Sequence, residues 1–204
     1  MPGRSIGLSG WAAAALVAAA LQLPAQVIQF RSNGMDYQVM TKGGLTLMCA
    51  PMPVKTSRYA LVHVAVSNGS EVTWQVNATD FAFEFDRGVL VRAASEESVI
   101  GDFFREAGRS ELSKLQSAYE KALYNNQYIR PNNGYEKRRQ SALAIGPRGL
   151  KAASAAAAIT FVSGKLSPGD STDGALFFPT SGRQLNTGRI VATFGDVTFE
   201  FLSQ

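Results

Sequence analysis

The stretch 59-YALVHVAVS-67 carries the strongest strand pattern in the chain and decides the fold class. Successive side chains of a β-strand point to opposite faces, so the valines at positions 62, 64 and 66 share one face. The residues at positions 61, 63 and 65 share the other face. The tripeptide Asn68-Gly69-Ser70 follows and is typical of a turn. The pattern therefore predicts a β-strand that ends at a turn near residue 68.

Shorter strand patterns lie on both sides of this segment. On the N-terminal side, 36-DYQVMT-41 leads through Lys42-Gly43-Gly44 into 45-LTLMCAP-51. On the C-terminal side, 73-TWQVN-77 precedes 80-DFAFEFD-86, in which three phenylalanines alternate with smaller or acidic residues. Arg87-Gly88 then has the composition of a hairpin turn into 89-VLVR-92. We expect antiparallel strands connected by tight turns.

Strand patterns return at the end of the chain. The segment 159-ITFVSGKL-166 is followed by the polar run 167-SPGDSTDG-174, which we expect to be a loop before a short strand at 175-ALFFP-179. The final pair, 189-RIVATF-194 and 197-VTFEFL-202, is separated by Gly195-Asp196. Two residues of this kind between alternating runs are a strong signal for a β-hairpin.

Between these two blocks the hydrophobic period changes from two to about 3.6. Ser95 can cap a helix near residues 95–107, and further helical patterns cover residues 110–123 and 134–145. Strands followed by clustered helices and more strands predict a mainly β protein. We expect an immunoglobulin-like antiparallel β-sandwich over residues 26–204, with an inserted segment of about three helices at 95–145.

Three stretches resemble a loose group of bacterial exported domains, mostly of unknown function, that have a telokin-like immunoglobulin fold. The stretches are 59-YALVHVAVSNGSEVTWQVNATDFAFEFDRG-88, 165-KLSPGDSTDGALFFP-179 and 189-RIVATFGDVTFEF-201. The resemblance implies the sandwich fold for the β-portion of the chain. It supplies no catalytic residues, and the helical block at 95–145 departs from a minimal domain of this kind.

The N-terminus has the order of charge and hydrophobicity that is typical of a secretory signal peptide. Arg4 precedes the uncharged run 11-WAAAALVAAALQL-23, and Ala25 provides a small residue at a cleavage point. The run is shorter than the roughly 20 residues that a membrane-spanning helix needs. We expect residues 1–25 to be removed and the chain to be periplasmic or extracellular, without a membrane span. An uncleaved N-terminal anchor is the alternative.

Composition argues against several classes of function. A net charge of +4 over 204 residues is too small to indicate nucleic acid as a partner. The chain has one cysteine and one histidine, so neither a metal site nor a cofactor is expected. Cys49 lies in an apolar stretch and predicts a buried, inert thiol. We interpret His63 as a surface or partly covered structural residue, because no serine or cysteine motif suggests a catalytic partner.

Carboxylates are the remaining chemical groups that could carry catalysis. Asp80, Glu84 and Asp86 lie on one predicted strand, and the last two share a face about 7 Å apart. A glycosidase pair or a calcium site can be drawn there. The favoured interpretation is a solvated sheet face opposite the phenylalanines.

Two features of the helical block complete the candidate residues. Tyrosines and asparagines gather in and beside 124-YNNQYIRPNNGY-135, and both residue types suit adaptable binding contacts. The candidate binding residues are Tyr124, Asn125, Tyr128, Asn132, Asn133 and Tyr135; packing of the tyrosines against the sandwich is the alternative. Arg138 and Arg139 fall on the apolar side of the last helix and are expected to anchor it by pairing with carboxylates.

These observations favour a non-enzymatic interaction or accessory module of the bacterial cell envelope. Its partner would be another envelope protein or a glycan, and its oligomeric state stays open. A carboxylate-dependent glycan-active enzyme and a glycan-binding module are the alternatives.

Overall fold

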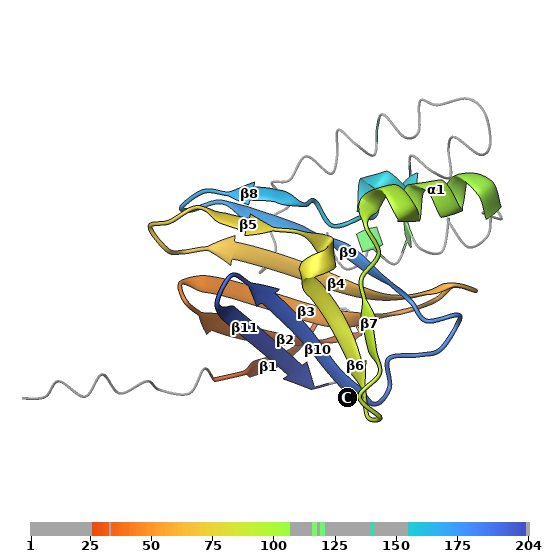
Figure 1. Cartoon of the computed structure of the whole chain (residues 1–204), viewed down its shortest axis with the longest axis horizontal. Coiled ribbons are helices and arrows are strands. Elements are labelled where there is room, and N and C mark those ends of the chain that lie inside the picture. The colour runs from red at the N-terminus through yellow and green to blue at the C-terminus, as the bar shows by residue number, and fades with distance from the viewer. Residues whose placement is uncertain are drawn as a thin grey trace, which may run out of the picture.

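The computed structural model describes residues 26–32, 34–106, 116–117, 119–120, 140 and 155–202. The described chain is mainly β and forms two larger sheets and a short ribbon (Figure 1). The five-stranded sheet has the order β1 (Ile28–Ser32), β2 (Met35–Lys42), β3 (Leu45–Lys55), β4 (Tyr59–Asn68) and β9 (Ser171–Pro179). The four-stranded sheet has the order β11 (Val197–Leu202), β10 (Gly188–Phe194), β6 (Phe81–Phe85) and β7 (Leu90–Arg92). The ribbon pairs β5 (Trp74–Val76) with β8 (Gly164–Leu166).

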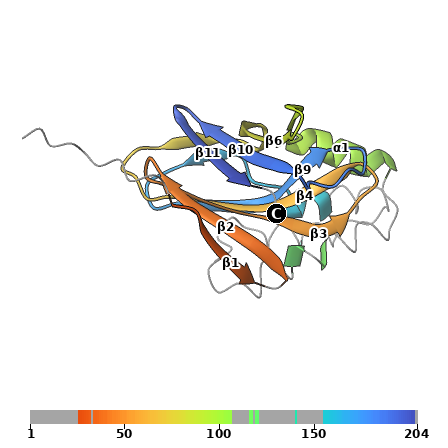
Figure 2. The same ribbon diagram turned by 90° about the horizontal axis from the view of Figure 1, so that it is seen from below.

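The two sheets stack face to face, as Figure 2 shows from below, and enclose the first hydrophobic core. The three valines of β4 point into this core, where they meet phenylalanines from β6, β10 and β11. Neighbouring strands in both sheets pair antiparallel. The predicted antiparallel, sandwich-like β architecture is confirmed.

A second hydrophobic core lies on the opposite face of the five-stranded sheet. There Leu61 of β4 and Phe177 of β9 pack with Val99 and Phe103 of helix α1 (Glu96–Glu106) and with Ile159. Residues 155–159 are helical and belong to the same cluster. The five-stranded sheet is therefore the middle layer of the described fold, and both of its faces are buried.

The tight turns lie where the sequence predicts them. Lys42 pairs with Leu45 across Gly43-Gly44, and Phe194 pairs with Val197 across Gly195-Asp196. The β6–β7 connection turns at Gly88, whose amide donates to the carbonyl of Phe85. These turns fix the register of three hairpins.

The described residues contain fewer helices than expected. Of the three helices predicted in residues 95–145, α1 is described, and Ser95 caps it by accepting a hydrogen bond from the amide of Ser98 at 3.3 Å. The short 3-10 helix η1 (Ala78–Asp80) was not expected. The ranges 110–123 and 134–145 fall outside the described residues, except for positions 116–117, 119–120 and 140, which are helical. None of the described helices is long and apolar enough to span a membrane.

The polar run before 175-ALFFP-179 is not a loop throughout, so that prediction was wrong. Strand β9 begins at Ser171 and continues the ladder with β4, pairing Thr172 with Val66 and Asp173 with Ala65. The long partner strand holds these polar residues extended. Their side chains find partners, since Thr172 donates to the carbonyl of Val162 and Asp173 accepts from Tyr119.

Gly174 allows the backbone of Thr160 and Phe161 to pass close to β9. Phe161 donates its amide to the carbonyl of Ala175 at 3.0 Å, and Thr160 bridges to Ala175 in parallel. A β-carbon on Gly174 would lie 2.3 Å from Cα of Phe161 and 2.6 Å from its nitrogen, both backbone atoms. Glycine is therefore required at this position by the approach of two backbones.

We predict that Gly174→Ala lowers the free energy of unfolding by about 2–3 kcal/mol, because backbone atoms cannot move aside as a side chain can. Gly164→Ala in β8 is the matched control, since no heavy atom lies within 4 Å of its added β-carbon. Urea unfolding of both variants measures the effect. Equal unfolding midpoints for the two variants would show that the backbone of Phe161 does not pass close to Gly174 of β9.

Candidate functional site

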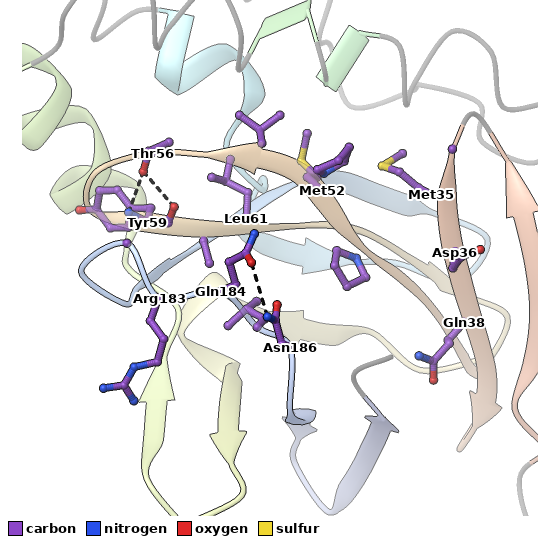
Figure 3. A pocket seen from close by; sticks show the side chains of 17 residues that line it. Met35, Asp36, Gln38, Met52, Thr56, Tyr59, Leu61, Arg183, Gln184 and Asn186 are labelled. Carbon is purple, nitrogen blue, oxygen red and sulfur yellow. Dashed lines mark hydrogen bonds between the residues drawn. The ribbon is translucent and has the colours of Figure 1, made fainter.

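A cleft of about 360 Å³ opens at the end of the sandwich where β2, β3 and β4 face the 182–186 loop (Figure 3). Its described lining comes from four segments that are far apart in the sequence. These are Gly34–Asp36 with Gln38, then Pro51–Val54 with Thr56, then Tyr59–Leu61, and finally Gly182–Asn186. This cleft is the candidate functional site.

The cleft exists because β2 and β3 stop pairing before either strand ends. The last pair between them joins Gln38 to Cys49, whereas β2 continues to pair with β1 as far as Met35 opposite Ser32. On β3, Pro51 and Pro53 lie just beyond the last pair. Proline has no N–H group to donate to a ladder, so these two residues break the pairing. The β3–β4 register also shifts between Pro51 and Lys55.

The apolar residues of the lining divide between the two cores. Met35, Met52 and Leu61 are almost fully buried and belong to the second core, on the face of the five-stranded sheet away from the 182–186 loop (Figure 3). Leu185 of the loop is buried in the first core.

The rim of the cleft is polar and carries a cation. Arg183, Gln184 and Asn186 are exposed on the loop, and Figure 3 shows Gln184 and Asn186 turned toward one another. The guanidinium carbon of Arg183 lies 5.0 Å from the ring centre of Phe85. Asp36, the carboxylate among the described lining residues, lies 3.5 Å from Arg31. The described lining thus combines amide groups with one arginine and one carboxylate, whose formal charges cancel.

The inner wall of the cleft is held by Thr56 and Tyr59. The Thr56 hydroxyl accepts from the amide of Tyr59 at 2.7 Å and donates to its carbonyl at 2.9 Å. The Tyr59 hydroxyl donates to the buried carboxylate of Asp102 on α1, which also pairs with Arg105 at 2.7 Å and Arg58 at 3.3 Å. This cluster ties the helix to the sheet beside the cleft.

The pKa values of Tyr59 and Asp102 are shifted in opposite directions. Burial, together with the hydrogen bond to Asp102, raises the pKa of Tyr59 to about 12, so its hydroxyl stays a donor at neutral pH. The hydrogen bond from Tyr59, assisted by Arg105 and Arg58, lowers the pKa of Asp102 despite its burial. Asp102 is therefore ionised and fully paired, which is a structural arrangement.

His63 was expected at the surface or partly covered, and this expectation was wrong. The side chain is fully buried in the second core, between the rings of Tyr37 and Tyr119, whose centres lie 6.0 Å and 5.6 Å away. Its Nδ1 lies 3.3 Å from the Tyr37 hydroxyl, and its Nε2 has no hydrogen-bond partner among the described residues. The helical layer on this face, which the strand pattern does not reveal, is what removes His63 from water.

The three carboxylates that offered the alternative of a glycosidase pair or a calcium site do not form a joint site. Asp80 belongs to η1, where it accepts hydrogen bonds from the amide and the side chain of Asn77. Glu84 pairs with Arg189 at 2.8 Å on the outer face of the four-stranded sheet, and Asp86 is exposed at the β6–β7 turn. None of the three lines the cleft. The pairing of Glu84 with Arg189 was not foreseen, because their strands are distant in sequence.

The other sequence-based candidates lie outside the described residues. They comprise the predicted binding residues Tyr124, Asn125, Tyr128, Asn132, Asn133 and Tyr135 and the predicted anchors Arg138 and Arg139. Tyr119, which precedes them, is described and fully buried, and its hydroxyl donates to Asp173 at 3.0 Å. This tyrosine packs against the sheet. Cys49 is buried as predicted, and burial raises the pKa of its thiol.

Sequence reasoning did not find the cleft. Its lining is assembled from segments between Gly34 and Asn186, and no local motif joins them. One signal was available, since 51-PMPVK-55 places two prolines in a run that otherwise continues a strand. Proline at alternate positions indicates an unpaired edge.

We predict that the pKa of His63 lies near 4, well below the usual 6.5, because burial disfavours the charged ring. The unfolded chain then binds a proton at a higher pH than the folded chain. The free energy of unfolding should therefore decrease as the pH falls from about 6.5 to about 4, by on the order of 3 kcal/mol. Because His63 is the single histidine, its ring proton gives one NMR signal to titrate.

The matched control is His63→Phe, which removes the titrating group but keeps an aromatic ring between Tyr37 and Tyr119. Its free energy of unfolding should be nearly constant between pH 6.5 and 5. A midpoint near 6.5 for the His63 signal of the folded protein would contradict the buried position.

Comparisons with protein-family models, with curated proteins and with solved structures gave no match to this chain.

Proposed function

We propose that this protein is a non-enzymatic binding module of the bacterial cell envelope and that the cleft between β2, β3 and the 182–186 loop is its binding site. The observation that carries the proposal is the composition of the cleft. The buried side chain of Leu185 lies beside the exposed amides of Gln184 and Asn186 and the exposed Arg183. Such a combination of apolar surface and a few polar groups is typical of ligand sites.

The chemistry of the cleft supports binding rather than catalysis. A glycosidase of the usual kind needs two carboxyl groups on either side of the scissile bond. The described lining contains one carboxylate, Asp36, which is exposed and close to Arg31. Tyr59 is protonated at neutral pH and engaged with Asp102, so it is a poor general base. The glycan-active enzyme is therefore the weaker alternative.

We also propose that the sandwich is of the immunoglobulin-like type. Two antiparallel sheets of five and four strands support this assignment, as does the closing hairpin β10–β11 at the edge of the second sheet. The helical layer on the outer face of the five-stranded sheet is an addition to a plain sandwich.

The proposed location is the periplasm or the extracellular space, after removal of residues 1–25. In the N-terminus a charged residue is followed by an apolar run and then by a small residue, and this order supports the proposed location. The partner would be an envelope protein or a glycan.

Site-specific photo-crosslinking tests the binding function. We predict that a benzophenone amino acid at Asn186, on the rim, gives a covalent adduct in the envelope fraction. The same amino acid at Thr193, which is exposed on β10 away from the cleft, is the matched control and should give none. Mass spectrometry of the adduct identifies the partner as polypeptide or glycan. No adduct at Asn186, or the same adducts at both positions, would contradict the proposal.

A further inference from the structure

The outer face of the four-stranded sheet carries side chains that no described layer covers. Alternate residues of β6, β10 and β11 fill the first core, so the residues between them point outward. Val191 and Ala82 are among these and belong to neither core. On β7, Val91 packs against the first core, so its neighbours point outward. Leu90 and Leu202 share this outer face and are 51% and 71% exposed. Figure 2 shows β10 and β11 on the outside of the fold, with the five-stranded sheet on their other side.

The strand register arranges eight of these outward side chains in two rows across the sheet. Each row contains two apolar residues, one arginine and one glutamate. In the strand order β11, β10, β6 and β7, the first row is Leu202, Arg189, Glu84 and Leu90, and the second is Glu200, Val191, Ala82 and Arg92. In each row the apolar residues occupy mirrored positions, and the arginine mirrors the glutamate.

This order makes the outer face complementary to the same face of a second copy. Consider a two-fold axis in the plane of contact that runs along the strands, between β10 and β6. It lays each row on the reverse of the same row in the second copy. Arg189 then faces Glu84 of the second copy, and Leu202 faces Leu90. In the other row, the glutamate of β11 faces the arginine of β7, and valine faces alanine. Opposite charges meet, and no like charges face one another.

The charges of this face are suited to partial burial. Arg189 already pairs with Glu84 and with Glu200 in its own chain, each at 2.8 Å, so contact with a second copy leaves no charge of this group unpaired. Arg92 donates to the carbonyl of Thr79 and has no described carboxylate within ion-pair distance. The facing glutamate of a second copy supplies one.

From this complementarity we infer that the outer face of the four-stranded sheet is the interface of a two-fold symmetric homodimer, in which two such sheets stack face to face. Stacked sheets prefer strand directions about 30° apart, and an axis tilted by about 15° from the strands provides this angle. None of the eight residues lines the cleft, so the inference does not depend on the proposed binding function.

The size of the face limits the strength of the dimer. Four strands at a spacing of about 4.8 Å make a face only about 15–20 Å wide. We therefore expect a weak dimer, with a Kd on the order of 10–100 μM. Far below this Kd, as in a dilute envelope fraction, the chain is a monomer, and a crosslinker at Thr193 on this face meets no second copy.

Sedimentation velocity of the purified protein, at concentrations from about 5 to about 500 μM, measures the association. Leu202→Glu and Leu90→Lys each place a charge opposite a leucine of the second copy, and both positions are exposed, so the fold is retained. We expect each substitution to raise the Kd of the dimer at least about tenfold. Val72→Glu is the matched control and should leave the Kd unchanged, because Val72 is 57% exposed between β4 and β5.

The double variant Leu202→Glu/Leu90→Lys tests which residues face one another. Within one chain these positions are three strand spacings apart, about 14 Å, which is too far for an ion pair. Across the two-fold axis they meet as opposite charges. We expect association to be restored, with a Kd within about threefold of that of the parent protein.

Two results would overturn the homodimer. One is a monomer at every concentration, and the other is a dimer that both leucine substitutions leave intact. A double variant that associates as weakly as the single variants would overturn the two-fold arrangement. Each of these results leaves the binding function of the cleft standing, because the cleft is tested by the adduct at Asn186.

Discussion

The burial of β4 on both faces is the constraint on which the rest of the structure depends. Its valines at 62, 64 and 66 point into the core between the sheets, while Leu61 and His63 point into the core beneath the helices. Each buried valine or leucine contributes roughly 1.5–3 kcal/mol relative to an exposed one. A slip of one residue in the ladder would put His63 among the valines and phenylalanines, so the register is strongly specified.

Burial of both faces explains why polar groups occur inside the protein. Asp173 and Asp102 lie beside the second core. Asp173 accepts a hydrogen bond from the hydroxyl of Tyr119, and Asp102 accepts one from the hydroxyl of Tyr59. Buried polar groups are tolerated when they are hydrogen-bonded. The pairing of Asp102 with Arg58 and Arg105 places α1 at the same end of the sheet as the cleft. The helical layer and the candidate site are thus connected through Tyr59, which belongs to both.

The sequence predicted the strands that alternate clearly and the turns that join them, because both signals are local. It predicted 59-YALVHVAVS-67 as a strand but not that its second face is covered, since a histidine among small apolar residues is compatible with a half-exposed face. Strand β1 was missed although Asn33-Gly34 is a strong hairpin signal and Gly34 has a positive φ of 78°. Its exposed residues lack an alternating pattern. The cleft was missed because its walls meet only in the folded chain.

Strand β4 also connects the fold to the cleft. Strands β3 and β9 pair with β4 along most of its length, and the prolines of β3 end the ladder with β2 at the edge of that region. The cleft is therefore an open edge attached to a well-buried sheet, which keeps its walls in place without a ligand.

Residue-resolved hydrogen exchange of the folded protein tests the central role of β4 most directly. Our account predicts the slowest exchange for the amides of β4 and β9, because their ladder opens only when the whole domain unfolds. The amide of Met35 or Asp36 that faces the cleft should exchange orders of magnitude faster. Amides of β4 that exchange as fast as those of the edge strand β1 would contradict the account.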